Sequence, residues 1–133
     1  MSRKQAREAA IKFTYQFDIS PDNIEFQLLR YKEEENVDED DFNYIKEVVN
    51  GVIDKKQKID EDIAINAKDW AISRIAKVDL AILRVAIFEI LYMDNIPYKV
   101  SINEAIELSK IYCEENSKSF INGILGAIVK DLQ

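Results

Sequence analysis

The densest hydrophobic stretch of the chain runs from Val78 to Met93, where thirteen of sixteen residues are apolar. Asp79, Arg84 and Glu89 are the exceptions. On a helix these apolar residues face nearly every direction, which is typical of a helix buried in a protein core or a membrane. A membrane span needs roughly 18 or more apolar residues with few charges. The stretch therefore predicts a central core helix, in which Arg84 and Glu89 each need a partner or an exit to water.

Apolar residues in the rest of the chain recur at spacings of three and four, which predicts further helices. These helices cover residues 3–17, a segment from Ser20, residues 39–66, a segment from Ser101 and one from about Ser117. Residues 39–66 fit either one long helix or two broken ones. Gly51 within them either permits close packing or weakens the helix by roughly 1 kcal/mol.

Helix-capping patterns set several of the predicted starts. Ser20 is a good N-cap because Pro21 then occupies the first helical position. Asp38 is the predicted N-cap of the helix over residues 39–66. Ser101 and Glu104 have the spacing of a capping box, which makes Ser101 the predicted N-cap of its helix.

The fold class follows from these elements and from the scarcity of turn residues. Three glycines and two prolines leave few places for tight turns, which argues against an all-β protein. We predict an all-α fold, a compact bundle of six or seven helices in one domain over residues 1–133. Two helical sub-bundles, about 1–68 and 69–133, are expected to surround the buried central helix at about 78–93.

Composition narrows the chemistry. The chain has no histidine, and Cys113, its one cysteine, falls on the apolar face of its helix. The usual general base, zinc ligands and thiol nucleophile are therefore lacking. The acidic runs 33–35 and 38–41 lack the glycine and alternating ligands of a calcium loop, and no glycine-rich phosphate loop occurs. We expect a binding protein, not an enzyme, with no catalytic residues, metal or cofactor.

The net charge and the N-terminal sequence indicate which partners the protein can bind and where in the cell it works. A net charge of -7 means that any nucleic-acid site must be a local basic patch on an acidic body. Arg3 and Arg7 lie one turn apart with Lys4 and Lys12 nearby, and they form a small basic cluster, which is otherwise a solvated helix face. Phe120 lies at the edge of its helix's apolar stripe beside Lys118, where it either stacks a base or belongs to the peripheral core. The single cysteine and the lack of an apolar leader predict a cytoplasmic protein with no membrane segment.

Particular runs of sequence resemble the NusB family of transcription antitermination factors over the whole chain, most specifically from Ile75 to Leu125. The matching runs are RKQAREAAIKFTY (3–15), VDLAILRVAIFE (78–89), IPYKVSINEAIELSK (96–110) and SKSFINGIL (117–125). The resemblance implies an all-helical fold of two bundles sharing a core. It also implies an RNA-binding factor that works with NusE, a small-subunit ribosomal protein. Together they would bind boxA-type single-stranded RNA of ribosomal RNA transcripts and join the RNA polymerase antitermination complex.

The resemblance also assigns residues. The RNA-binding positions it implies are Arg3, Lys4, Arg7, Lys118, Ser119 and Phe120, with cations holding phosphates and the ring stacking a base. The partner-binding positions it implies are Tyr15 and Asp79. Gln5 departs from the denser arginine run that is common in the family.

Three alternatives stay open beside this interpretation. One is a helical protein-interaction adaptor with little RNA affinity of its own, which the acidic surface and thin basic cluster favour. Another is the NusB-like domain of RNA methyltransferases, which is disfavoured because no cofactor-binding domain follows residue 133. A homodimer that hides the RNA face is an alternative to the monomer.

Overall fold

The computed structural model describes residues 1–68 and 70–133, and within them it contains seven α-helices, one 3₁₀ helix and no strand. The helices are α1 (Arg3–Ile19), α2 (Ile24–Glu34), α3 (Glu39–Asp54), α4 (Lys56–Asn66), α5 (Lys77–Tyr92), α6 (Tyr98–Tyr112) and α7 (Ser117–Leu132). The 3₁₀ helix is η1 (Ile72–Arg74). This architecture confirms the predicted all-α bundle of six or seven helices.

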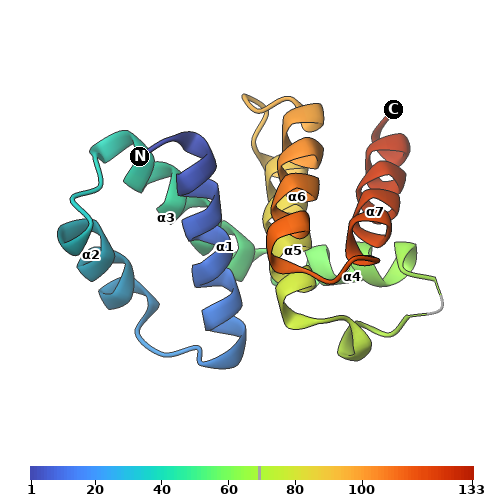
Figure 1. The fold of residues 1–133 in the computed structure, drawn as a ribbon, viewed down its shortest axis with the longest axis horizontal. Helices are drawn as coiled ribbons and strands as arrows, with labels where there is room; N and C mark the ends of the chain where they lie inside the picture. Colours follow the sequence, from blue (N-terminus) through green and yellow to red (C-terminus); the bar gives the residue numbers. More distant parts are fainter. Residues whose placement is uncertain (69) are drawn as a thin grey trace.

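Helix α5 is the centre of the bundle, as its sequence predicts. Every residue from Asp79 to Glu89 is buried, and α5 contacts α1, α3, α4, α6 and α7 (Figure 1). An all-apolar surface can be buried in this way only when neighbours cover it on every side. Among the residues that the structure describes, no helix is both long and apolar enough to cross a membrane.

Residues 39–66 form two helices, α3 and α4, with Lys55 between them. Helix α3 packs against α1 and α5, whereas α4 packs against α5 and α7 (Figure 1). The expected division at residue 68 therefore differs from the helix packing, because α4 lies with the C-terminal helices. The packing favours a division at Lys55.

Gly51 on α3 lies against the side chain of Phe88 on α5. A Cβ atom built at Gly51 would stand 2.1 Å from Cζ of Phe88, which is far inside van der Waals contact. The ring occupies the space that a side chain would need, so Gly51 serves close packing, one of its two predicted roles.

The helix starts show which capping patterns operate. Asp38 caps α3 as predicted, because its side chain accepts a hydrogen bond from the backbone N–H of Asp41 at 2.9 Å. Ser20 does not cap α2: α1 continues to Ile19, and α2 begins after Asn23, which adopts a left-handed conformation with φ 57°. Ser20 instead follows the last residue of α1 as its C-cap, because α1 extends two residues beyond the predicted end at residue 17.

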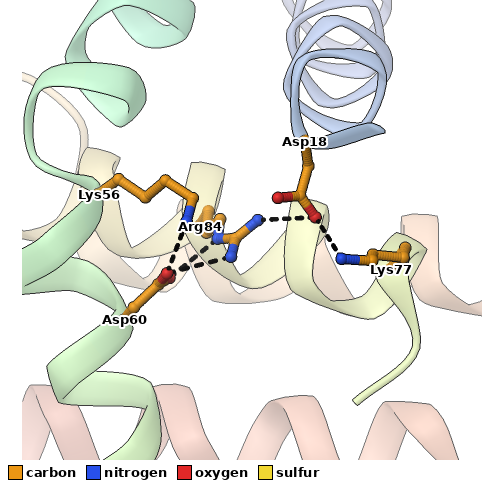
Figure 2. A network of polar contacts seen from close by, with 5 residues as sticks. All are labelled: Asp18, Lys56, Asp60, Lys77 and Arg84. Carbon is orange, nitrogen blue, oxygen red and sulfur yellow. Dashed lines mark hydrogen bonds and ion pairs between the residues drawn. The ribbon is translucent and has the colours of Figure 1, made fainter. Parts of the chain in front are cut away.

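Arg84 joins α5 to α4 and to the C-terminal end of α1 (Figure 2). Its guanidinium donates to both carboxylate oxygens of Asp60 on α4, at 2.9 and 3.1 Å. It also lies 3.4 Å from the carboxylate of Asp18 on α1. Lys56 and Lys77 complete the network by pairing with Asp60 and Asp18 respectively. The partner that Arg84 was predicted to need is thus supplied by two helices.

Candidate functional site

The start of α1 carries two exposed cations, Arg3 and Lys4. The helix begins with a capping box, in which Ser2 accepts from the backbone N–H of Gln5 and the Gln5 side chain accepts from that of Ser2. Gln5, the residue that departs from the arginine-rich family pattern, therefore stabilises the end of α1 that presents Arg3 and Lys4 to solvent.

Arg7 is buried, unlike Arg3 and Lys4, the other two residues of α1 that were expected to bind RNA. Its side chain is 5% exposed, with Nε donating to Glu89 at 2.8 Å and Nη1 donating to Glu104 at 3.2 Å. Burial, the largest single influence, lowers the pKa of Arg7, but the hydrogen bond to Glu89 and the nearby charges of Glu89 and Glu104 together raise it above its ordinary value. The placement does not favour a direct phosphate contact by Arg7, which is committed to a protein carboxylate.

Glu89 is the centre of a buried polar network that we call the Glu89 hub (Arg7, Tyr44, Glu89, Ser101 and Glu104). Glu89 is 0% exposed and accepts hydrogen bonds from Arg7, from the hydroxyl of Tyr44 and from the hydroxyl of Ser101 at 2.7 Å. These donors come from α1, α3 and α6. The hub satisfies the need for a partner that the sequence predicts for Glu89.

The hub also corrects the capping box predicted at Ser101 and Glu104. Helix α6 begins at Tyr98, with Pro97 at the N-cap position, so Ser101 lies inside the helix. Ser101 is buried and donates to Glu89, while Glu104 accepts from Arg7. Both side chains therefore form hydrogen bonds with residues of other helices, and they do not cap α6 as their spacing suggests.

Tyr44 connects the hub to the exposed cation Arg3. The guanidinium carbon of Arg3 lies 4.3 Å from the centroid of the Tyr44 ring, a cation–π contact. Burial, followed by the negative charge of Glu89, raises the pKa of Tyr44 well above its ordinary value. Tyr44 therefore stays a neutral hydrogen-bond donor. Sequence reasoning missed this residue, because it lies on α3, far along the chain from the basic cluster.

The start of α7 places the second group of predicted RNA-binding residues. Lys118 and Ser119 are exposed and Phe120 is half-buried. The Phe120 ring meets Trp70 edge-to-face, with centroids 6.5 Å apart and planes at 72°. Trp70 is 53% exposed, so the pair offers aromatic surface to a ligand. Trp70 is the single tryptophan of the sequence, and no pattern around it indicated a binding role.

A cleft of about 620 Å³ lies beside these rings. Asp79 and Ser117 help to line it, and the Ser117 hydroxyl donates to the Asp79 carboxylate at 2.7 Å. Asp79 is only 6% exposed, so its main contact joins α5 to the first residue of α7. This burial does not favour Asp79 as a direct partner contact.

Cys113 lies at the end of α6 and is half-buried against the core. Burial, with the Asp79 carboxylate nearby, raises the pKa of the Cys113 thiol to about 12. A thiol with so high a pKa is a poor nucleophile, which agrees with its prediction as a packing residue. Within 1–68 and 70–133, no group of three His, Cys, Asp or Glu side chains is arranged to hold a metal ion.

Tyr15 borders an apolar groove of about 390 Å³ between α1 and the α5–α6 pair. The other lining residues are Glu8, Ile11, Lys12, Val78, Leu108 and Tyr112. Tyr15 is 39% exposed and Tyr112 is 41% exposed. Exposed tyrosines beside an apolar groove are typical of protein-binding surfaces, so this position suits the partner role expected of Tyr15.

The two groups of predicted RNA-binding residues lie on different helices, at the start of α1 and at the start of α7. The Tyr15 groove shares Val78 and Tyr112 with the Phe120 cleft, so the groove and the cleft are neighbours. The Tyr112 hydroxyl also donates to the carboxylate of Glu8 on α1 at 2.6 Å. In Figure 1 α1 starts at the top, whereas the α6–α7 connection lies at the lower ends of those two helices. The two groups are therefore presented by different parts of the fold.

Comparisons with known proteins match the whole chain. Residues 4–130 match the sequence profile of the NusB family. The transcription antitermination protein NusB of Acetivibrio thermocellus is 49% identical over 130 residues, covering 98% of this chain and 90% of that protein. The protein of the same name from Clostridium acetobutylicum is 42% identical over 129 residues, covering 97% of this chain and 96% of that protein.

Solved structures agree with these sequence matches. NusB of T. maritima superposes with a TM-score of 0.89 at 33% identity, covering 98% of this chain and 92% of that one. A chain from a complex of the antitermination factors NusB and NusE with double-stranded RNA superposes with a TM-score of 0.85 at 28% identity. That match covers 97% of this chain and 96% of the other.

Proposed function

Because this chain belongs to the NusB family, we propose that it is an RNA-binding antitermination factor that acts with a NusE protein. In this proposal the pair binds boxA-type RNA of ribosomal RNA transcripts and helps RNA polymerase to resist termination. The protein acts by binding, without catalysis, and works in the cytoplasm where the transcript is made.

The observation that carries this proposal is the likeness, over 97% of the present chain, to a chain from the complex of NusB and NusE with double-stranded RNA. A fold alone does not specify a function, but here a complex with RNA and a full-length family match point the same way. The exposed cations and aromatic rings described above supply suitable chemistry.

The proposed RNA surface has two parts. Arg3 and Lys4 at the start of α1 bind phosphates, and Lys118 and Ser119 at the start of α7 do the same beside the stacking ring of Phe120. Trp70 adds a second ring to the α7 part. Since the two parts lie on different helices, one single strand contacts both of them in this proposal.

The proposed NusE surface is the apolar groove beside Tyr15. It lies next to the Phe120 cleft, so a protein in the groove and an RNA strand at Phe120 are neighbours. Such an arrangement lets each ligand strengthen the binding of the other, as reciprocal coupling requires.

Fluorescence anisotropy of a labelled boxA RNA tests this function. The unaltered protein, with and without NusE, is titrated at about 50 and 200 mM salt. We expect salt-sensitive binding that tightens with NusE, and weaker binding of a double-stranded RNA of the same sequence. The double variant R3A/K4A should bind more weakly and with a shallower salt dependence, by about 0.7 in slope for each lost phosphate contact.

Matched controls use residues outside the proposed surfaces. Lys58→Ala removes an exposed cation from α4 and should leave RNA binding unchanged. Tyr15→Ala should weaken NusE capture, whereas Ile65→Ala, which removes a 74% exposed apolar side chain, should not. Phe120→Ala should weaken RNA binding by about ten-fold, in line with the loss of one stacked base.

The second candidate is a protein-interaction adaptor, which the net charge of -7 favours. It predicts that NusE is captured through the Tyr15 groove while boxA RNA binds neither the protein nor the pair. That result would reject the RNA-binding proposal.

A further inference from the structure

Arg3 and Lys4 are adjacent and both exposed, but their surroundings differ. Arg3 stacks on the ring of Tyr44, whereas Lys4 stacks on no aromatic ring among the described residues. Tyr44 is 3% exposed. The Arg3 guanidinium therefore lies against a buried ring, and within residues 1–68 and 70–133 its N–H groups have no hydrogen-bond or ion-pair partner.

Contacts inside the fold also hold the Tyr44 ring. Its hydroxyl donates to Glu89, and the same carboxylate oxygen accepts from Nε of Arg7 at 2.8 Å. The guanidinium carbon of Arg7 lies 5.7 Å from the Tyr44 centroid. Two cations thus contact one ring, the buried Arg7 inside the hub and the exposed Arg3 outside it.

We propose that Tyr44 is a positioning residue for RNA binding, because its ring holds the Arg3 guanidinium in place for a phosphate. This inference rests on the proposed function and adds a residue that has no contact with RNA. An arginine side chain loses considerable rotamer freedom when a ligand immobilises it, and a side chain ordered in advance loses less. Stacking leaves the N–H edges available for a bidentate phosphate contact.

Arg7 gains a role from the same arrangement. Its guanidinium carbon lies 5.7 Å from the centroid of the Tyr44 ring, so it supports the ring from inside the fold and acts on RNA binding through Tyr44 and Arg3. The family resemblance implies a role in RNA binding for both arginines. In this proposal the two roles differ, because Arg3 contacts the phosphate and Arg7 supports the Tyr44 ring.

A double-mutant cycle tests the proposal. RNA binding in the presence of NusE is measured for Y44F, Y44L, R3A and R3A/Y44L. Y44F keeps the ring and loses the bond to Glu89, so it should unfold at a lower temperature yet bind RNA within about two-fold of the unaltered protein. Y44L should bind about five-fold more weakly. In the R3A background Y44L should have no further effect, because the side chain that it positions is absent.

Different results would overturn the inference. If Y44F and Y44L weaken binding equally, or if Y44L weakens binding as much in the R3A background, Tyr44 has a purely structural role. Absence of RNA binding by the unaltered protein with NusE would reject the proposed function and this inference together. Intact binding by both Tyr44 variants rejects the inference alone.

A measurement on the unaltered protein avoids any folding defect of Y44L. The NMR order parameter of the Arg3 side-chain Nε should be well above that of Arg30 on α2, whose side chain is 63% exposed and forms only a surface ion pair with Glu34 at 3.4 Å, a kind of contact that restrains a side chain little. An Arg3 as mobile as Arg30, with an order parameter below about 0.6, would contradict positioning by Tyr44.

Discussion

Two buried charges on α5, Arg84 and Glu89, are held by different kinds of surroundings. Glu89 is 0% exposed and receives donors from three helices. Arg84 is 3% exposed, but its acceptors are less deeply buried, because the side chains of Asp60 and Asp18 are 18% and 14% exposed. Glu89 is thus a fully enclosed acceptor, whereas Arg84 reaches out of the core to carboxylates near the surface.

This difference in burial determines how much the free energy of unfolding falls when one partner of the contact is removed. A buried ion whose partner is removed is left without solvent, and the penalty is severe. A partly exposed ion recovers water when its partner is lost, so the penalty is smaller. The same helix therefore carries one charge that the fold requires and one that links helix ends.

Glu89→Ala should show the largest effect. It leaves Arg7 buried without its main acceptor, so the free energy of unfolding should fall by about 4 kcal/mol. Glu89→Gln keeps the shape and one acceptor oxygen and should cost less. Urea denaturation followed by circular dichroism gives both values, and a loss below about 1 kcal/mol for Glu89→Ala would show that the hub does not stabilise the fold.

Arg84→Ala should come next, with a loss of about 2 kcal/mol, because Asp60 and Asp18 can turn to water once the guanidinium is gone. The same denaturation experiment checks it. A loss equal to that of Glu89→Ala would remove the distinction between the two charges.

Gly51→Ala provides an uncharged reference beside the Glu89 hub. The added methyl group meets the Phe88 ring, so we expect a loss of about 1–3 kcal/mol from overpacking. Gly126→Ala is the matched control, since a Cβ there meets nothing within 4 Å. That variant should gain about 0.5–1 kcal/mol from helix propensity. Equal effects of the two substitutions would contradict the close approach of α3 to α5.

Asp18→Asn should have the smallest effect, below about 1 kcal/mol, and the effect should depend on pH. Burial raises the pKa of Asp18, but the hydrogen bond from Lys77 and the charge of Arg84 lower it further, so the net pKa is below 3.8. A lowered pKa gives stability above pH 3.8 that disappears as the pH falls through the folded value. The difference between Asp18→Asn and the unaltered protein should therefore vanish in acid, as denaturation at several pH values will test.

Much of the fold was predictable because it depends on long patterns. The apolar run from Val78 to Met93 was enough to place α5 at the centre, and the need of Arg84 and Glu89 for partners followed from burial alone. The start of α6 was not predictable in the same way. Ser101 and Glu104 match a capping box locally, but both bind hub residues that are distant in the sequence.

The candidate site was predicted less completely, for a related reason. Arg3 and Arg7 lie one turn apart and look equivalent, yet α1 is covered by both α3 and α5, and this second contact buries Arg7. Ile11 and Thr14 continue the same buried face, so the spacing of 7, 11 and 14 was a usable signal. Tyr44 and Trp70 had no such signal, since their roles depend on which helices meet.

Helix α2 differs from every other helix in how it is attached. Among its eleven residues, all of which the structure describes, Leu28 alone is buried. Tyr31 adds an edge-to-face contact with Phe13 at 5.3 Å, and clefts lie on both sides of that contact. With so little buried surface, we expect α2 to open without disturbing α5, so its amide hydrogens should exchange with solvent at a much lower free energy than global unfolding. Hydrogen exchange should therefore find a slowly exchanging centre and one segment that detaches while the rest of the chain stays folded.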